Sequence, residues 1–438
     1  MPIKNRTSLL LSLIFFITCF SAQLIAAPKI DTWTTKNGAN VYFVSTPALP
    51  IVDVRVIFDA GSSRDQTQFG LSHLTNALMD QGAGKWNADE IAENFDRIGA
   101  RYSNGALRDM AWHSIRSLKD PSLLNNAVTT LAEIIQKPIF KQKDFERERK
   151  RTLIALKQQQ ESPSDIAEKE FYQQLYPQHP YASPQDGSLE SVSALTVADL
   201  ISFHQKYYVA KNSVISIVGD INKQQANQIV AQLMEALPEG EKPLAIPKVS
   251  AVNAEVTKKI EFPSSQTHIW VGQPAISRTD PDYFSLYLGN HILGGSGLIS
   301  MISNEVREKN GLAYSAYSYF LPMREAGPFR MGLQTKNKQA QKAYEIMLKV
   351  LNEFIQNGPT EKQVIAAKSN ITGGFPLRID SNKKIVEYLG MIGFYQLPID
   401  YLDKFNQRIN DVTIEQIKQA FKARVNPEKL VSIWVGGQ

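Results

Sequence analysis

The chain repeats itself, and this repetition constrains its fold more than any other feature. From Thr196 to Gly219 the residues read as a helix-capping threonine, an amphipathic helix and a short apolar strand ending in glycine. The stretch from Thr413 to Gly436 contains the same parts in the same order, with the glycine again 23 positions after the threonine. Gln416, three residues after Thr413, also fits a capping box.

A second pair of similar segments has nearly the same offset. Gly99-Ala-Arg-Tyr-Ser103 corresponds to Gly311-Leu-Ala-Tyr-Ser315, 212 residues later, whereas the first pair is separated by 217 residues. Chance similarity of generic helix–strand units could produce either match alone, but less readily both. The sequence therefore predicts two halves built on one architecture.

Each half mixes strands with long amphipathic helices, without strict alternation. The predicted strands are Val41–Val44, Val52–Phe58, Ile269–Val271 and Phe329–Gln334, and the predicted helices are Asp144–Gln160 and Gln341–Gln356. We therefore expect an α+β fold in which each half is a mostly antiparallel sheet with helices packed on one side. Proline, glycine and charged residues from Pro238 onward predict a linker. The expected boundaries are 28–240 for the N-terminal half, 241–257 for the linker and 258–438 for the C-terminal half.

The first 27 residues differ in kind from the rest. Lys4 and Arg6 precede an apolar run from Leu9 to Phe20, and small residues follow up to Ala27. This layout is typical of a cleavable secretory signal, because the run is too short for a stable membrane anchor, which is the alternative. The only cysteine, Cys19, leaves with the signal. We expect a periplasmic or secreted protein with no membrane segment after signal removal.

The net charge of the chain argues against nucleic acid or anionic lipid as a partner. Removing residues 1–27 takes away two basic residues and lowers the formal charge from +5 to +3, with 46 basic and 43 acidic residues remaining. This excess is too small to indicate binding to nucleic acid or to anionic lipid.

One segment resembles a zinc-binding motif in its spacing but lacks one of the ligands and the catalytic base. An inverted zinc-peptidase motif, His-x-x-Glu-His on a helix, places two histidine ligands on one face and a glutamate base between them. Here His73 occupies the first ligand position, but Asn76 takes the place of the base and Ala77 that of the second histidine. An amide is not basic near neutral pH, and alanine offers no ligand atom. His73 is thus expected to be a partly buried helix histidine.

The third ligand of such a site would be a glutamate on a later helix, and Ala155 stands in register there. No acidic residue occurs between Glu148 and Glu161, and no two of the six histidines are four residues apart. We therefore predict no catalytic residues and no metal or other cofactor in this chain.

Together, several motifs resemble the insulinase/pitrilysin family, specifically the bacterial branch built as paired subunits of about this length. The similar segments span the mature chain: Asp59–Arg64, Gly70–His73, His179–Tyr181, Tyr207–Tyr208, Val218–Asp220, Leu293–Gly297, Arg307–Ser315, Gly327–Phe329 and Gly373–Arg378. The resemblance implies an insulinase-like fold, and the altered metal site implies a non-catalytic subunit. Zinc would then reside in the partner, a zinc-bearing homologue.

The resemblance also implies a substrate-binding role for Arg307 and Tyr314, which match an arginine–tyrosine pair of the family's C-terminal half. A guanidinium and a phenol can hydrogen-bond the carbonyl groups of an extended peptide. The alternative is that Arg307 forms a surface ion pair with Glu305 or Glu308 and that Tyr314 is a core aromatic of a strand. The equivalent tyrosine of the first half is Tyr102, but the position equivalent to Arg307 holds Phe95, which carries no charge. The arginine–tyrosine pair is therefore a feature of the second half only.

Three functions are compatible with these residues. The leading hypothesis is a non-catalytic, peptide-binding subunit that pairs with a zinc-bearing homologue to process unfolded peptides. The second is a homodimeric peptide-binding or assembly module without an enzymatic role. The third is an active peptidase with an unconventional site.

Overall fold

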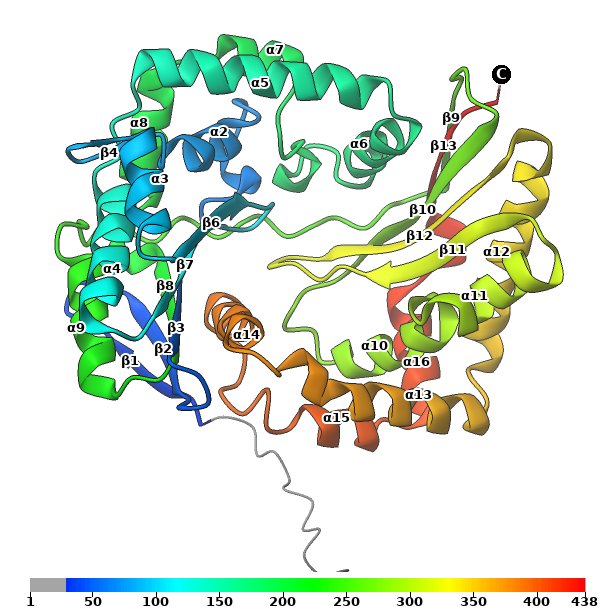
Figure 1. Ribbon diagram of the computed structural model, residues 1–438. Coiled ribbons are helices and arrows are strands. Elements are labelled where there is room, and N and C mark those ends of the chain that lie inside the picture. Colours follow the sequence, from blue (N-terminus) through cyan, green and yellow to red (C-terminus); the bar gives the residue numbers. More distant parts are fainter. Residues whose placement is uncertain (1–28, 438) are drawn as a thin grey trace, which may run out of the picture.

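The computed structural model describes residues 29–437, which fold into two sheet-and-helix halves that face each other (Figure 1). The predicted signal peptide, residues 1–27, lies outside the described residues. No helix within residues 29–437 is long and apolar enough to cross a membrane.

The N-terminal half contains a six-stranded sheet in the order β1-β2-β8-β3-β7-β6. These strands are β1 (Asp31–Thr34), β2 (Asn40–Ser45), β8 (Ser213–Gly219), β3 (Ile51–Phe58), β7 (Ala111–Leu118) and β6 (Arg101–Ala106). All neighbouring strands are antiparallel except β2 and β8. A small hairpin, β4 (Gly82–Ala83) and β5 (Trp86–Asn87), lies outside this sheet.

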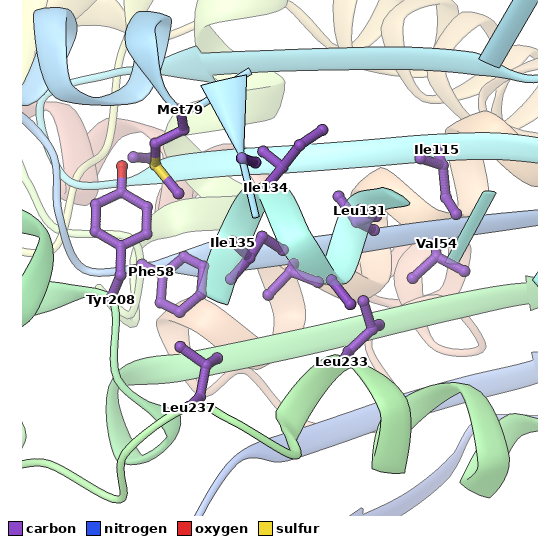
Figure 2. Close-up of a cluster of buried hydrophobic side chains, with 14 of the residues drawn as sticks. Val54, Phe58, Met79, Ile115, Leu131, Ile134, Ile135, Tyr208, Leu233 and Leu237 are labelled. Carbon is purple, nitrogen blue, oxygen red and sulfur yellow. The ribbon is translucent and has the colours of Figure 1, made fainter. Parts of the chain in front are cut away.

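The helices of this half cover one face of the sheet. They are α2 (Leu71–Leu78), α3 (Ala88–Asp96), α4 (Pro121–Gln136), α5 (Gln142–Gln160), α7 (Leu189–Ala194), α8 (Val197–Tyr207) and α9 (Lys223–Met234). Apolar residues of α4 recur every three or four positions, so one stripe of the helix packs on the sheet. Figure 2 shows Leu131 and Ile135 of α4 with Val54 of β3, Ile115 of β7 and Leu233 of α9 in this core.

The C-terminal half contains a five-stranded sheet in the order β11-β12-β10-β13-β9. The strands are β11 (Ala313–Phe320), β12 (Gly327–Lys336), β10 (Gln266–Ile276), β13 (Val431–Val435) and β9 (Val256–Ile260), and only β13 and β9 pair in parallel. Its helices are α10 (Tyr283–Asn290), α11 (Met301–Ser303), α12 (Ala340–Asn357), α13 (Glu361–Gly374), α15 (Phe405–Asp411) and α16 (Ile414–Arg424).

The two sheets confirm the predicted repetition. Read from β2 to β6, the first sheet has the same order and parallel pair as the second read from β9 to β11. Thr196 and Thr413 both cap their helices through capping boxes, and the following strands, β8 and β13, occupy equivalent inner positions. The segments from Gly99 and Gly311 lead into the two edge strands, β6 and β11. The α+β class with mostly antiparallel sheets is confirmed.

One helix of each half packs on the sheet of the other half. Helix α6 (Pro163–Leu175) packs on β10 and β13 of the second sheet, and α14 (Asn382–Tyr395) packs on β8 and β3 of the first (Figure 1). Phe171 of α6 contacts Trp270 of β10, with ring centroids 5.7 Å apart. This exchange explains why β8 and β13 are buried along their whole length, because helices cover both faces of these strands.

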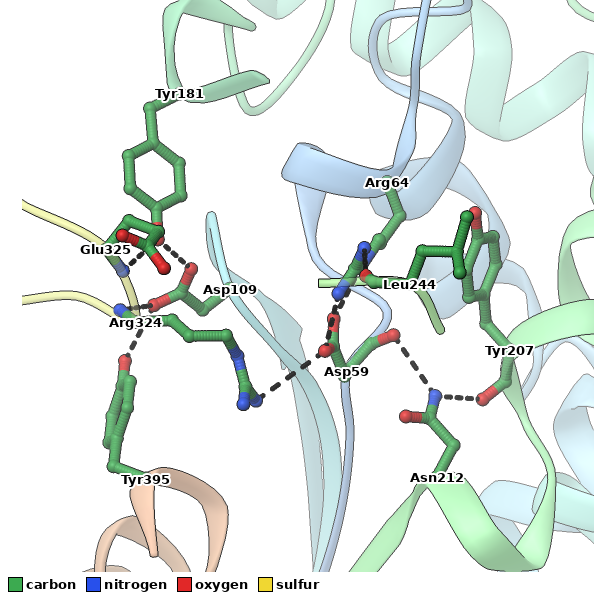
Figure 3. Close-up of polar contacts among 10 residues, drawn as sticks. All are labelled: Asp59, Arg64, Asp109, Tyr181, Tyr207, Asn212, Leu244, Arg324, Glu325 and Tyr395. Atoms are coloured by element: carbon green, nitrogen blue, oxygen red, sulfur yellow. Dashed lines mark hydrogen bonds and ion pairs between the residues drawn. The ribbon is translucent and has the colours of Figure 1, made fainter. Parts of the chain in front are cut away.

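A buried polar cluster joins the two halves where the β11–β12 hairpin meets the first sheet (Figure 3). Asp109, in the turn between β6 and β7, accepts hydrogen bonds from Tyr181 Oη at 2.7 Å, Tyr395 Oη at 3.0 Å and the backbone N–H of Arg324 at 2.7 Å. Burial raises the pKa of Asp109 even though these donors oppose the shift. The Arg324 guanidinium lies 3.5 Å from Asp59, which also pairs with Arg64.

The close packing of α14 gives a direct test of the helix exchange. A Cβ atom added at Gly393 would lie 2.5 Å from both Tyr42 Cε2 and Val214 Cγ1. We expect Gly393→Ala to destabilise the protein by about 1–3 kcal/mol through overpacking. Thermal denaturation measures this loss.

The matched control is Gly373→Ala on α13, where an added Cβ meets no atom within 4 Å. Alanine there is expected to be neutral or to stabilise by up to about 1 kcal/mol, because it favours the helix. Equal melting temperatures for the two variants would contradict the packing of α14 on the first sheet.

Candidate functional site

Helix α2 carries three of the four positions of the predicted degenerate metal site. It begins after Gly70, which adopts φ 89°, so no side chain at the N-cap can bind the first free N–H groups. The buried carboxylate of Asp65 takes this role by accepting from the N–H groups of Gly70 and Ser72, both at 2.8 Å. Asp65 thereby fixes the start of the helix below α5 (Figure 1).

His73 lies on the partly exposed side of α2. Its side chain is 37% exposed, and Nδ1 lies 3.3 Å from Oδ1 of Asp186. Asp186 in turn accepts a hydrogen bond from Gln159 at 3.0 Å. The arrangement is an ordinary histidine–carboxylate contact at the surface.

Asn76 is buried and belongs to a polar network in the core. Its Nδ2 lies 3.1 Å from Nε2 of His113 on β7 and 3.4 Å from the hydroxyl of Tyr208. Nδ1 of His113 lies 2.8 Å from the hydroxyl of Tyr102. When the Asn76 amide donates to Nε2, the neutral ring carries its proton on Nδ1 and donates it to Tyr102. Burial, followed by the charges of His204 and Arg55, lowers the pKa of His113 to about 3, so the ring is neutral at pH 7.

The remaining positions offer no metal ligand. Ala77 is half-buried on α2, and Ala155 is exposed on α5. Within residues 29–437, no group of three or more histidine, cysteine, aspartate or glutamate side chains lies close enough together to hold a metal ion. The position of the catalytic base is thus occupied by Asn76, whose amide hydrogen-bonds the buried His113.

Arg307 and Tyr314 lie together in the C-terminal half. Arg307 belongs to the π-helical turn η6 (Asn304–Lys309), and Tyr314 is at the start of β11. The guanidinium carbon lies 5.0 Å from the centroid of the Tyr314 ring, a cation–π distance. Nε of Arg307 is also 3.5 Å from Glu308, as the alternative interpretation expects. Tyr314 is 85% exposed and is therefore no core aromatic.

The equivalent pair in the N-terminal half has a different character. Phe95 stacks on Tyr102 with ring centroids 5.3 Å apart and planes 10° apart. Phe95 is buried, and the Tyr102 hydroxyl serves the His113 network. The repeated fold thus brings the two members of the pair into contact in both halves, but only the C-terminal pair presents a charge and an exposed phenol.

The sequence did not reveal Asp65, His113 or Asp186 as parts of the site. His113 could have been suspected from the alternation of β7, which directs Ala111, His113 and Ile115 to the same buried face. Gly294 and Gly295, in the segment Leu293–Gly297 that resembles the family, lie in the π-helical turn η4 (His291–Gly295). A Cβ at Gly294 would meet Ser318 at 2.3 Å, so this glycine allows the turn to pack on β11.

The network around Asn76 predicts a stability effect. Asn76→Ala leaves Nε2 of His113 buried without a hydrogen-bond partner and should cost about 1–3 kcal/mol. Urea denaturation of this variant is compared with that of Asn125→Ala, an exposed position on α4 where a change within about 0.5 kcal/mol is expected. Identical midpoints for the two variants would contradict a structural role for the Asn76 amide.

The empty ligand positions predict the outcome of rebuilding the site. In the double variant Ala77→His, Ala155→Glu, two histidines four residues apart would share a face of α2, with a carboxylate on the adjoining helix. We expect this variant to retain about one zinc ion per chain after dialysis, measured by elemental analysis. The wild type and the single variant Ala77→His should retain far less. Equal zinc retention by the wild type would show that its own residues suffice.

Comparison with known proteins identifies the family. Residues 40–187 match the model described as "Insulinase (Peptidase family M16)", and residues 194–371 match "Peptidase M16 inactive domain". A crystal structure described as a peptidase M16 inactive domain, from Pseudomonas fluorescens, is 39% identical and has a TM-score of 0.91, covering 93% of this chain and 98% of that one.

Two curated relatives differ in what their names state. An uncharacterized zinc protease of Bacillus subtilis, YmxG, is 24% identical and covers 89% of this chain and 94% of its own length. A Helicobacter pylori protein named a non-peptidase homolog, also YmxG, is 24% identical and covers 87% of this chain and 88% of its own length. The chain therefore belongs to the insulinase family, peptidase family M16, as a peptidase homologue whose zinc-motif positions carry no ligand beyond His73.

Proposed function

We propose that this protein is the non-catalytic, peptide-binding subunit of an exported zinc metallopeptidase and that it pairs with a zinc-bearing homologue. The observation that carries the proposal is the contrast between two sites. On α2 the position of the catalytic base, Asn76, is built into a core network, whereas Tyr314 is exposed at the surface beside the half-buried Arg307.

The surroundings of Arg307 and Tyr314 favour an extended peptide as the ligand. Tyr314 lies on β11, an edge strand whose outer side pairs with no other strand among the described residues. A peptide can add to such an edge through main-chain hydrogen bonds. The guanidinium and the phenolic hydroxyl can then donate to its carbonyl oxygens, and the exposed ring can supply apolar contact.

Hydrolysis would require the metal centre of a second chain. A zinc peptidase needs a bound water activated by the ion and a basic side chain, and Asn76, Ala77 and Ala155 provide neither ligand nor base. In a pair, Arg307 and Tyr314 would hold the peptide and stabilise negative charge on the scissile carbonyl oxygen while the homologue supplies zinc. The signal-like residues 1–27 support export of the chain to the periplasm or the medium.

A peptide-binding module without an enzymatic role is the second candidate. It is favoured by the same arginine–tyrosine pair and by the name of the Helicobacter pylori relative, a non-peptidase homolog. In that case peptides would bind without any effect on a peptidase.

The test combines the purified chain with the His-x-x-Glu-His homologue from the same host. Cleavage of fluorescent peptides is measured for each protein alone and for the mixture, with and without a chelator. We expect chelator-sensitive cleavage that the mixture increases. Arg307→Ala should lower that stimulation by about tenfold, the loss expected for one charge-assisted hydrogen bond.

Lys309→Ala is the matched control, because Lys309 lies on the same turn and pairs with Glu305. It should leave the stimulation unchanged. Zinc-dependent cleavage by this chain alone would overturn the proposal. Peptide binding that Arg307→Ala abolishes, without any stimulation of the homologue, would establish the second candidate instead.

A further inference from the structure

A cavity of about 280 Å³ lies in the C-terminal half, away from the metal-site positions of α2. Helix α10, the turn η4, the end of β11 and the 3-10 turn η8 (Phe375–Arg378) surround it. Two sequence motifs without an assigned role, Leu293–Gly297 and Gly373–Arg378, meet at this point although they are about 80 residues apart. The volume is near the lower limit of small-molecule sites, roughly 300 Å³.

The charge in this cavity comes from Arg378, an exposed side chain that forms part of the lining. No carboxylate of the described residues lies within 4.0 Å of its guanidinium; its neighbours are the hydroxyls of Tyr287 and Tyr388. Two other arginines of this half do pair with carboxylates: Arg408 with Asp400 at 2.9 Å and Arg424 with Asp280 at 3.2 Å. An exposed guanidinium that has no carboxylate partner can pair with the carboxylate of a ligand.

A second group in the cavity also lacks a partner. Nε2 of His291, the first residue of η4, is buried and has no hydrogen-bond partner among the described residues. Burial, and then the charge of Arg378, lower the pKa of His291, so the ring is neutral at pH 7 and Nε2–H can serve as a donor. π-helical turns occur frequently at functional sites.

Tyrosines supply further hydroxyl groups near the cavity, whereas the Asn290 side chain in the lining is already hydrogen-bonded to Ser318. Tyr283 and Tyr287, whose rings stack 6.0 Å apart, line the same space. Arg278 borders it through Tyr283, 3.4 Å from the tyrosine hydroxyl, and likewise has no carboxylate within 4.0 Å in the described part of the chain. None of the described lining residues is acidic.

We propose that this cavity binds a carboxylate, which the guanidinium of Arg378 holds and to which His291 and the tyrosine hydroxyls donate hydrogen bonds. A planar guanidinium matches the two oxygens of a carboxylate. The carboxylate belongs either to a free small molecule or to the C-terminus of a peptide. The peptide case rests on the proposed function: Tyr319 of β11 lines the cavity five residues after Tyr314, roughly 16 Å along the strand.

The experiment titrates the purified chain, residues 28–438, with four probes by calorimetry. The probes are succinate, inorganic phosphate, a peptide with a free C-terminus and the same peptide with an amidated C-terminus. Saturable binding of succinate or of the free-acid peptide, but not of the amide, is expected. Binding of succinate alone identifies a free ligand, and binding of the free-acid peptide alone identifies a peptide C-terminus.

Variants test the assignment of residues. Arg378→Met should weaken carboxylate binding at least tenfold, and Arg378→Lys should retain part of it. Arg151→Met, at an exposed position on α5, is the matched control and should bind as the wild type does. His291→Leu tests the second donor and replaces Arg378→Met if that variant fails to fold.

Several outcomes would overturn the carboxylate site. They are equal binding of acid and amide peptides, tighter binding of phosphate than of either carboxylate, unchanged affinity in both Arg378→Met and His291→Leu, and dissociation constants above about 10 mM for every carboxylate. The succinate titration needs neither a peptide nor a homologue, so its failure is distinguishable from failure of the proposed function.

Discussion

The structure depends on two helices, α6 and α14, that each bury one face of the other half's sheet. The inner strands β8 and β13 are apolar on both faces, so neither sheet can leave one face to water. Helices of the same half bury one face, and α14 or α6 from the other half covers the opposite one. Glycines at positions 390 and 393 let α14 approach the first sheet closely enough to exclude water. The Asp109 cluster then fixes where the β11–β12 hairpin meets this assembly.

Much of this fold could be predicted from the sequence, because the repeated helix–strand unit and the alternation of strands are local patterns. The equivalence of β8 with β13, and of the edge strands β6 and β11, follows from the two pairs of similar segments. The exchange of α6 and α14 could not be predicted. An apolar stripe shows that a helix is buried, but it does not show which sheet buries it.

The candidate site, too, could be predicted from the sequence only in part. The spacing of the motif indicated that Asn76, Ala77 and Ala155 leave the metal site incomplete. The partners of Asn76 remained unknown, since His113 and Tyr208 lie far from it in the sequence and reach it only through tertiary packing. Arg307 and Tyr314 were found through resemblance, and their contact at 5.0 Å depends on a π-helical turn that no simple periodicity predicts.

The exchanged helices have a consequence for the connection between the halves. The segment from Leu237 to Glu255 contains no helix or strand and is the covalent link between them. Helix α6 of the first half packs on the second sheet, and α14 of the second half packs on the first sheet. Because of these contacts, we expect the two fragments produced by a cut in this segment to stay associated. The arrangement resembles a domain-swapped dimer fused into one polypeptide.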